Sequence, residues 1–334
     1  MTDNKRKALL VIDGGTTNLR VTLLDAETLE VLGTEKRDGG VRYTAIDGNN
    51  ARLRSALADA VAALASADGG EEIELERTIA YGMITSNLGL CELPHLEAPA
   101  SLEDLRNGMH AEEFPDIAPG AIEFIPGVRN FYGSVDLANV SAMDMMRGEE
   151  TEAVGLYALL GLKEEALFVL PGSHNKFVHM GEAGEILGCM TSISGELLDA
   201  VTHHTILAGS TGGEFCTEKT YDAALALAGA GECRRSGLGR AAFSGRILQT
   251  AGGFPQSAIP SYLLGAVLAE DEKALAQFLG GKKSVKIFAA GKAPLQQAVC
   301  DVLREAGYEA VRPVAAEFSA KMGTLGALTI AGIG

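Results

Sequence analysis

The sequence predicts an α/β protein built from two related domains that face each other across a cleft. Three strands, then a helix and a further strand, are predicted twice along the chain, from residue 8 and again from residue 166. In each copy the first strand is apolar and runs into a glycine-containing turn rich in hydrogen-bond donors. A length of 334 residues allows one large domain or two medium ones.

In the first copy, short polar breaks separate three strands and predict an antiparallel meander. These strands are expected at residues 8–12, 19–25 and 29–36. Apolar residues at helical spacing predict a helix over 52–65, followed by a strand at 77–81 and a loop at 82–89. Residues 90–145 are expected to be irregular, with one strand at 122–125.

A helix over 147–160 leads to the second copy, and its acidic first turn suits the positive end of a helix dipole. A buried strand at 166–170, a hairpin and a helix that opens at Ser194 follow. The hairpin strands are expected at 177–180 and 185–191. Residues 218–280 show helical periodicity, and the chain ends in alternating strands and helices at 284–289, 295–305, 308–311 and 315–330.

Composition argues against several classes of function. The formal net charge is −16 and no run of five Lys or Arg residues occurs, so nucleic-acid binding is disfavoured. The five cysteines form no CxxC pair, which indicates idle thiols in a reducing compartment and argues against a zinc site. No apolar run is long enough for a signal peptide or a membrane-spanning helix, so we expect a cytoplasmic protein.

The first turn lies in the stretch VIDGGTTNLR, which begins at Val11. Glycines let the backbone approach an anion closely, so that successive N–H groups can converge on it. Asp13 stands at the strand end, where a carboxylate can hold hydrated Mg²⁺. The residues that could surround a phosphate chain are Gly14, Gly15, Thr16, Thr17 and Asn18. A plain hairpin turn is the alternative, because Asp-Gly is a common hairpin signal.

The second turn, PGSHNK, also follows a buried strand. Its donors are Gly172, Ser173, His174, Asn175 and Lys176. Two such turns at equivalent points of two similar halves indicate a phosphate chain held from both sides. A third element, the strand that runs into Gly291, ends in small residues that would let a flat ring lie against the backbone. Close packing of a strand on a helix would need the same small residues.

Together these motifs resemble the acetate kinase–sugar kinase–Hsp70–actin ATPase superfamily, and more narrowly the 2-dehydro-3-deoxygalactonokinase family. The resemblance covers nearly the whole chain, and MRGEET followed by PGSHNK is its specific part. It rests on IDGGTTNLR (12–20), GMITSNLG (82–89), MRGEETEAVG (146–155), LPGSHNKFV (170–178) and SGELLDAVTHHTIL (194–207).

The resemblance implies two ribonuclease H-like (actin-like ATPase) domains with an interdomain cleft. Residues 1–150 would hold the first phosphate turn and a substrate loop. Residues 151–334 would hold the second phosphate turn and an adenosine site, and the last helix could pack back on the first domain. The implied activity is phosphorylation of 2-dehydro-3-deoxy-D-galactonate at O6 by ATP and Mg²⁺, a step of galactonate breakdown.

Site residues follow from the same resemblance. Asp13 would orient Mg²⁺ through water, and the two turns, with Gly291, would bind ATP. Related sugar kinases place a Gly-Asp at the start of the helix before the second phosphate strand. Here that place is Gly148-Glu149, so Glu149 is the first candidate for the general base, Glu150 the second and Asp144 the third. The alternative is that these glutamates only complement a helix N-terminus.

The substrate carboxylate would need a cation, and Arg147 and Arg129 are the candidates because a guanidinium presents a fork of donors. Ser86 and Asn87 match the sugar-contacting loop of related kinases. Two other functions stay open. One is a kinase of a different sugar or sugar acid, and the other is a nucleotide-gated binding protein of the actin or Hsp70 type. The oligomeric state is open, with a homodimer as one alternative.

Overall fold

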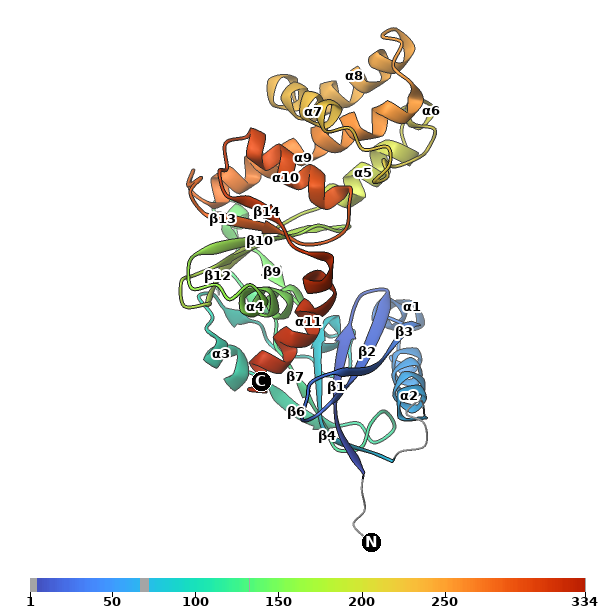
Figure 1. Ribbon diagram of the computed structural model, residues 1–334, viewed down its shortest axis with the longest axis vertical. Helices are drawn as coiled ribbons and strands as arrows, with labels where there is room; N and C mark the ends of the chain where they lie inside the picture. Colours follow the sequence, from blue (N-terminus) through green and yellow to red (C-terminus); the bar gives the residue numbers. More distant parts are fainter. Residues whose placement is uncertain (1–4, 67–71, 132, 334) are drawn as a thin grey trace. The chain divides into compact units, whose positions relative to one another are not determined.

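The structure is a computed structural model that describes residues 5–66, 72–131 and 133–333. Contacts within the chain divide it into two compact units (Figure 1). Unit 1 comprises Met1–Glu164, Glu182–Gly188 and Ala320–Gly334, and unit 2 comprises Glu165–Gly181 and Cys189–Ser319. The functional division expected at residues 1–150 and 151–334 stays a prediction.

Unit 1 contains a six-stranded sheet in the order β3-β2-β1-β4-β7-β6. Strands β1, β2 and β3 pair antiparallel, which confirms the predicted meander. Strand β4 is parallel to β1 and to β7, and β6 is antiparallel to β7 at the sheet edge. The strands are β1 (Arg6–Gly14), β2 (Asn18–Asp25), β3 (Val31–Asp38), β4 (Ile73–Gly82), β6 (His110–Glu113) and β7 (Ala121–Phe124).

Helix α2 (Ala51–Ser66) covers one face of this sheet (Figure 1). Its buried residues recur at helical spacing, from Leu53 and Leu57 to Val61 and Leu64. They form one core with buried residues of the sheet such as Ile12. The helix predicted over 52–65 is therefore confirmed, and it is preceded by the short helix α1 (Arg42–Asp47).

The segment 90–145 contains more regular structure than the sequence predicts. The strand predicted at 122–125 is confirmed as β7, but the expectation that the rest of the segment is irregular is wrong. Helix α3 (Leu102–Asn107) begins there with a capping box that Ser101 and Asp104 form. The segment also contains four elements of two or three residues, which are too short to show a hydrophobic period in the sequence. They are β5 (Leu96–Glu97), β8 (Val128–Arg129), η2 (Val140–Ala142) and β9 (Met145–Met146). Strand β6 and helix α3 are the longer elements that the sequence did not predict. Strands β5, β8 and β9 form a small sheet of their own.

Helix α4 (Glu149–Leu159) crosses the C-terminal part of helix α11 (Ala316–Ile330) at backbone distance. A Cβ atom on Gly155 would lie 1.8 Å from the carbonyl oxygen of Met322. A Cβ atom on Gly326 would lie 1.8 Å from that of Thr151. The crossing therefore depends on glycine in both helices.

Unit 2 repeats the strand order of unit 1. The five-stranded sheet runs β12-β11-β10-β13-β14, with β10 antiparallel to β11 and parallel to β13, and of β12 the residues from Cys189 on belong to unit 2. The strands are β10 (Ala166–Leu170), β11 (Asn175–Met180), β12 (Ile186–Ser192), β13 (Lys286–Ala289) and β14 (Val311–Pro313). The equivalent order β3-β2-β1-β4-β7 in unit 1 confirms the predicted repeat and the ribonuclease H-like class of each unit.

The helical periodicity predicted within residues 218–280 is confirmed by α7 (Ala223–Ser236), α8 (Leu238–Thr250) and α9 (Ile259–Phe278), with the short η3 (Gln256–Ala258) before α9. Outside that range, unit 2 also contains α5 (Ser194–His203), α6 (Ala208–Thr211) and α10 (Leu295–Glu305). The strand expected at 308–311 is β14, which begins later, at Val311, and Tyr308 before it is a buried core residue. Within the described ranges, no helix has both the length and the apolar character needed to cross a membrane.

Candidate functional site

The first turn presents its N–H groups outward. The N–H of Gly15 donates to the carbonyl of Asn18 at 3.0 Å and closes the turn. The carbonyl oxygens of Gly15, Thr16 and Thr17 accept from the N–H groups of residues 39–42 at 2.9–3.3 Å. Thr16, Thr17 and Asn18 are exposed, and the N–H groups of Thr16 and Thr17 have no partner among the described residues. Such a turn can donate to an anion.

Three glycines bring the ends of β1 and β4 against the start of α4. A Cβ atom on Gly14 would lie 2.5 Å from the Cβ of Ile84. Gly82 has a φ of +87°, and its Cβ would lie 2.9 Å from the carbonyl oxygen of Gly14. Gly148 has a φ of +120°, and a Cβ atom on it would lie 3.3 Å from the Cα of Gly82. This packing places Asp13 beside the first turn of α4.

Four acids of unit 1 share this region: Asp13, Glu149, Glu150 and Glu152. Burial raises the pKa of Asp13, and the charge of Glu149 adds to that rise. The guanidinium of Arg20, 3.9 Å from the Asp13 carboxylate, and the hydroxyl of Tyr81 oppose it. Burial, and then Asp13 and Glu149, raise the pKa of Glu152 well above its ordinary value. The carboxylates of this cluster repel one another, and Asp13 at its edge is partly exposed. The cluster therefore suits a hydrated divalent cation, which would reduce the repulsion.

Glu149 and Glu150 differ in burial and in hydrogen bonding. Glu150 is fully buried, and its two carboxylate oxygens accept from the N–H of Gly148 at 2.9 and 2.8 Å. Burial, followed by the charge of Glu149, raises the pKa of Glu150 to about 7. Glu149 is only partly buried and accepts from the N–H of Arg147 at 3.1 Å. Glu150 thus binds the backbone at the start of α4, whereas Glu149 is partly exposed.

The third candidate base, Asp144, lies just before β9 and accepts from the N–H of Met145 at 2.7 Å. The roles of all three acids stay predictions.

The expected substrate loop is held by a guanidinium. Arg147 donates to the carbonyl and hydroxyl of Thr85 at 2.5 and 2.6 Å, and to the carbonyl of Leu93 at 2.9 Å. Within the loop, the hydroxyl of Ser86 donates to the carbonyl of Met83 at 2.7 Å, and Asn87 is exposed. Both terminal nitrogens of Arg147 and the hydroxyl of Ser86 therefore bind other groups of the protein, whereas Asn87 is exposed.

Arg129 lies beside the same region. Its Nε donates to the carbonyl of Phe131 at 2.6 Å. Burial, and then the charges of Arg147 and Arg129, lower the pKa of His95 to about 4, so this imidazole is neutral at physiological pH. The Nδ1 of His95, which the sequence did not single out, accepts from the guanidinium of Arg147 at 3.2 Å. The roles of Arg129 and Arg147 toward a carboxylate stay predictions.

In unit 2, buried side chains hold the second turn. Asn175 is fully buried, and its amide oxygen accepts from the N–H of Gly172 at 3.0 Å. Its amide nitrogen donates to the Asp271 carboxylate at 2.7 Å. The hydroxyl of Ser194 donates to the other oxygen of Asp271 at 2.5 Å. Asp271, on helix α9, thus links the turn to the start of α5, and burial raises the pKa of its carboxyl group.

Helix α5 begins in direct contact with the second turn. A Cβ atom on Gly195 would lie 2.1 Å from the carbonyl oxygen of Gly172. The N–H of Glu196 donates to the carbonyl of Ser173 at 3.0 Å, and the imidazole of His174 lies 3.0 Å from the Glu196 carboxylate. The ammonium of Lys176 is bonded to the hydroxyl of Thr191, with its side chain almost fully buried. Among these predicted residues, His174 is exposed and Lys176 lies within the sheet.

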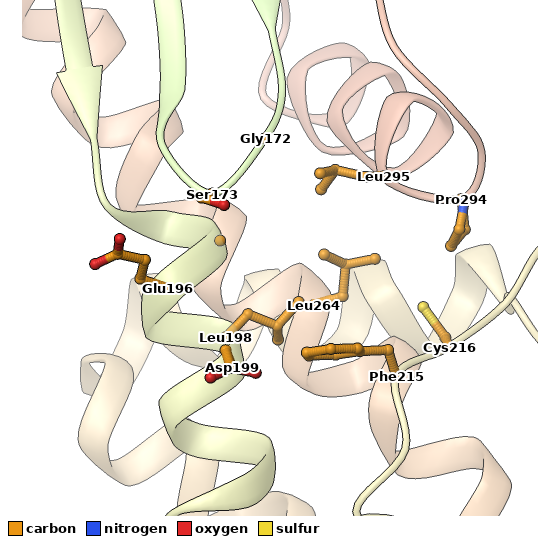
Figure 2. A pocket seen from close by; sticks show the side chains of 11 residues that line it. Gly172, Ser173, Glu196, Leu198, Asp199, Phe215, Cys216, Leu264, Pro294 and Leu295 are labelled. Atoms are coloured by element: carbon orange, nitrogen blue, oxygen red, sulfur yellow. The ribbon is translucent and has the colours of Figure 1, made fainter. Parts of the chain in front are cut away.

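A pocket of about 460 Å³ adjoins this turn (Figure 2). Its walls are mainly apolar, with Leu198, Phe215 and Leu264 together and Leu295 opposite them (Figure 2). Gly172 and Ser173 of the turn, and Asp199 of α5, also line it. This volume lies in the range of small-molecule sites. Gly291 is not among the lining residues. It has a φ of +110° and contacts Pro171.

Sequence reasoning missed Tyr81 and Asp271, as well as Asp199 and Phe215 of the pocket. Tyr81 stands in the predicted strand 77–81, but nothing in the sequence pairs it with Asp13. Asp271 lies 96 positions from its partner Asn175. Asp271 stands between Glu270 and Glu272 in the charged run of α9, so the sequence carries no signal that separates it from its neighbours.

Comparison with known proteins gives three results. A family model described as 2-keto-3-deoxy-galactonokinase matches residues 13–324. A curated protein of Rhizobium meliloti (strain 1021), named as a probable 2-dehydro-3-deoxygalactonokinase, is 30% identical over 197 residues, which are 59% of this chain and 57% of that protein. A crystal structure from Sinorhizobium meliloti, described as a proposed enzyme of the same name, has a TM-score of 0.74 at 26% identity, covering 96% of this chain and 99% of that one.

Proposed function

This chain belongs to the 2-keto-3-deoxy-galactonokinase family, and we propose that it transfers a phosphoryl group from ATP to O6 of 2-dehydro-3-deoxy-D-galactonate. The family match carries the proposal, because it begins at Asp13 and includes both glycine-containing turns and Glu149. The names of the two relatives point to the same acceptor. The aligned part of this chain spans about 57% of the length of the curated relative.

Unit 2 supplies the features that suit a nucleoside. The pocket offers apolar side chains to a flat base, and the carboxylate of Asp199 can accept from ribose hydroxyls. Gly172 and Ser173 belong both to the pocket wall and to the second turn. A nucleoside bound in the pocket would therefore start its phosphate chain next to backbone donors of that turn.

Unit 1 supplies the features that suit phosphate and Mg²⁺. We assign the free N–H groups of Thr16 and Thr17 to phosphate oxygens of ATP. Asp13 would hold hydrated Mg²⁺, while Tyr81 and Arg20 keep its carboxylate in place. When bound, Mg²⁺ neutralises charge on the phosphates during transfer.

The base in this proposal is Glu149. As O6 attacks the γ-phosphorus, the new P–O6 bond forms and the bond to ADP breaks, while the O6 proton passes to the Glu149 carboxylate. Arg147 positions the loop around Thr85 and Leu93, and Asn87 is the exposed loop side chain that can contact the sugar. Arg129, beside the neutral His95, is the cation assigned to the substrate carboxylate.

A coupled assay of ADP release with a panel of 2-keto-3-deoxy sugar acids tests the proposal. We expect fast release only with 2-dehydro-3-deoxy-D-galactonate. If ADP release were fast only with a different sugar acid, the protein would still be a kinase, but the proposed acceptor would be wrong. ADP release that no sugar acid accelerates would favour the nucleotide-gated binding protein.

A further inference from the structure

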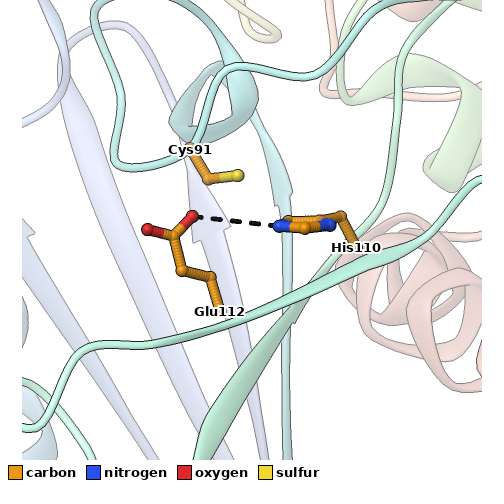
Figure 3. Close-up of side chains that lie close together, drawn as sticks. All are labelled: Cys91, His110 and Glu112. Carbon is orange, nitrogen blue, oxygen red and sulfur yellow. Dashed lines mark ion pairs between the residues drawn. The ribbon is translucent and has the colours of Figure 1, made fainter.

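Three side chains of the kinds that bind metal ions meet on unit 1, apart from the acid group described above (Figure 3). They are Cys91, His110 and Glu112. Their ligand atoms, the thiol sulfur, an imidazole nitrogen and a carboxylate oxygen, all lie within 4.8 Å of one another. None of these residues has a part in the proposed phosphoryl transfer.

The fold explains why the three side chains meet. His110 and Glu112 stand two positions apart in β6, so they project from the same face of this edge strand. Their Nε2 and Oε2 atoms are 4.0 Å apart (Figure 3). Pairing with β7, through His110–Phe124 and Glu112–Ile122, fixes the strand. Cys91 comes from another segment, where its N–H donates to the carbonyl of Ile84 at 3.4 Å.

The three positions also differ in exposure in a way that suits an ion near the surface. Cys91 is 8% exposed, whereas the side chains of His110 and Glu112 are 56% and 49% exposed. The ion would contact the buried thiol on one side and water on the other. Because His110 and Glu112 are exposed, their side chains can adjust by the small distance that coordination requires.

The donor set selects the class of ion. Thiolate, imidazole and carboxylate are the ligands of zinc, and zinc sites with three protein ligands keep a fourth position for water. Mg²⁺ prefers oxygen ligands and is a poor match for sulfur. Without an ion, the thiol donates a hydrogen bond to Glu112, and burial raises the pKa of Cys91 to about 11.

We propose that Cys91, His110 and Glu112 bind one zinc-class divalent ion, with water in the fourth position. On binding, the S–H bond of Cys91 breaks, its proton leaves to solvent, and a sulfur–metal bond forms without change of oxidation state. The absence of a CxxC pair, which argued against zinc in the sequence, does not bear on ligands drawn from two separate segments.

Such an ion would tie the expected substrate loop to the sheet. Leu90 and Cys91 are the two residues that follow this loop, and both donate backbone N–H groups to the carbonyl of Ile84. The ion would connect that end of the loop to β6. We therefore expect the ion to stabilise unit 1 as well as to bind it.

Titration of tag-free, ATP-free protein with Co²⁺ and then Zn²⁺ tests the proposal. We expect a thiolate-to-cobalt charge-transfer band that saturates at about one ion per chain. Zn²⁺ should abolish the band, whereas excess Mg²⁺ should leave it. Zn²⁺ should also raise the Tm of the protein.

Matched variants make the test specific. Cys91→Ser should remove the charge-transfer band, and His110→Gln and Glu112→Gln should each weaken binding by more than about 10-fold. Glu113→Gln is the control, because Glu113 neighbours Glu112 in β6 but projects from the opposite face. Absence of the band in wild type, or equal affinity in wild type and the three ligand variants, would overturn the proposal.

Discussion

The two glycine-containing turns stand at equivalent points of the two units but are held in different ways. Backbone groups of residues 39–42 hold the first turn, and its own side chains are exposed. Buried side chains hold the second, through Asn175, Asp271 and Ser194. The same local geometry can therefore rest on backbone contacts, which few substitutions remove, or on side chains, which one distant substitution can remove.

Their surroundings differ as well. The first turn adjoins the acids Asp13 and Glu149, whereas the second adjoins an apolar pocket lined by Phe215 and Leu264. This division suits a reaction in which one unit handles metal, phosphate and proton while the other binds a nucleoside. Substitutions in unit 1 should then change kcat, and those in unit 2 should change KM for ATP.

The largest effect is expected at Glu149. Glu149→Gln removes the proposed base and should lower kcat by about 10²–10⁴-fold, with ATP affinity unchanged. Steady-state kinetics and ATP binding by calorimetry measure the two quantities.

Glu150→Gln is the matched control for that variant. Because Glu150 is buried and caps α4, its substitution should change stability more than kcat. Near-normal turnover of Glu149→Gln, together with a large loss of kcat in Glu150→Gln, would reverse the two assignments.

A glycine pair tests how each turn is held. Gly195→Ala places a Cβ atom 2.1 Å from the carbonyl oxygen of Gly172, and Gly40→Ala places one 2.5 Å from that of Thr16. Each should destabilise the protein by about 3 kcal/mol in urea unfolding. Gly231→Ala is the control, because nothing lies within 4 Å of its Cβ position. If Gly195→Ala unfolds at the wild-type urea concentration, the contact between α5 and the second turn is misplaced.

The sequence predicted the antiparallel meander, the repeated group of strands and the positions of both turns, because apolar strands and glycine turns are local signals. The helices over 52–65 and 295–305 are present with bounds that differ by at most one residue. What it could not predict depends on contacts distant in sequence. Asp271 contacts Asn175, and Tyr81 contacts Asp13, only in the folded protein. The sequence pattern also does not indicate that Arg147 binds Thr85 or that Lys176 binds Thr191.

A smaller effect is expected at Asp271. Asp271→Ala leaves the amide of Asn175 and the hydroxyl of Ser194 without their acceptor and should cost about 2 kcal/mol of stability. Because the second turn would loosen, KM for ATP should rise more than kcat falls. Partial recovery of KM in Asp271→Asn, which keeps one acceptor oxygen, separates positioning from general destabilisation. Equal KM in all three proteins would exclude a positioning role.

The smallest effect concerns pH. The pKa of Glu150 is raised from 4.5 to about 7 in the folded protein, so the folded state binds the proton more tightly than the unfolded state does. The free energy of unfolding should therefore fall as pH rises from about 4.5 to about 7. Glu150→Gln should flatten this dependence in urea titrations across that window. The same dependence in wild type and in Glu150→Gln would contradict the raised pKa of this carboxyl group.

Phosphorus NMR of a reaction of the protein with ATP, Mg²⁺ and 2-dehydro-3-deoxy-D-galactonate tests the central claim most directly. We predict a new phosphomonoester resonance coupled to the protons of carbon 6, growing in step with ADP. Release of inorganic phosphate in place of that ester would contradict a kinase.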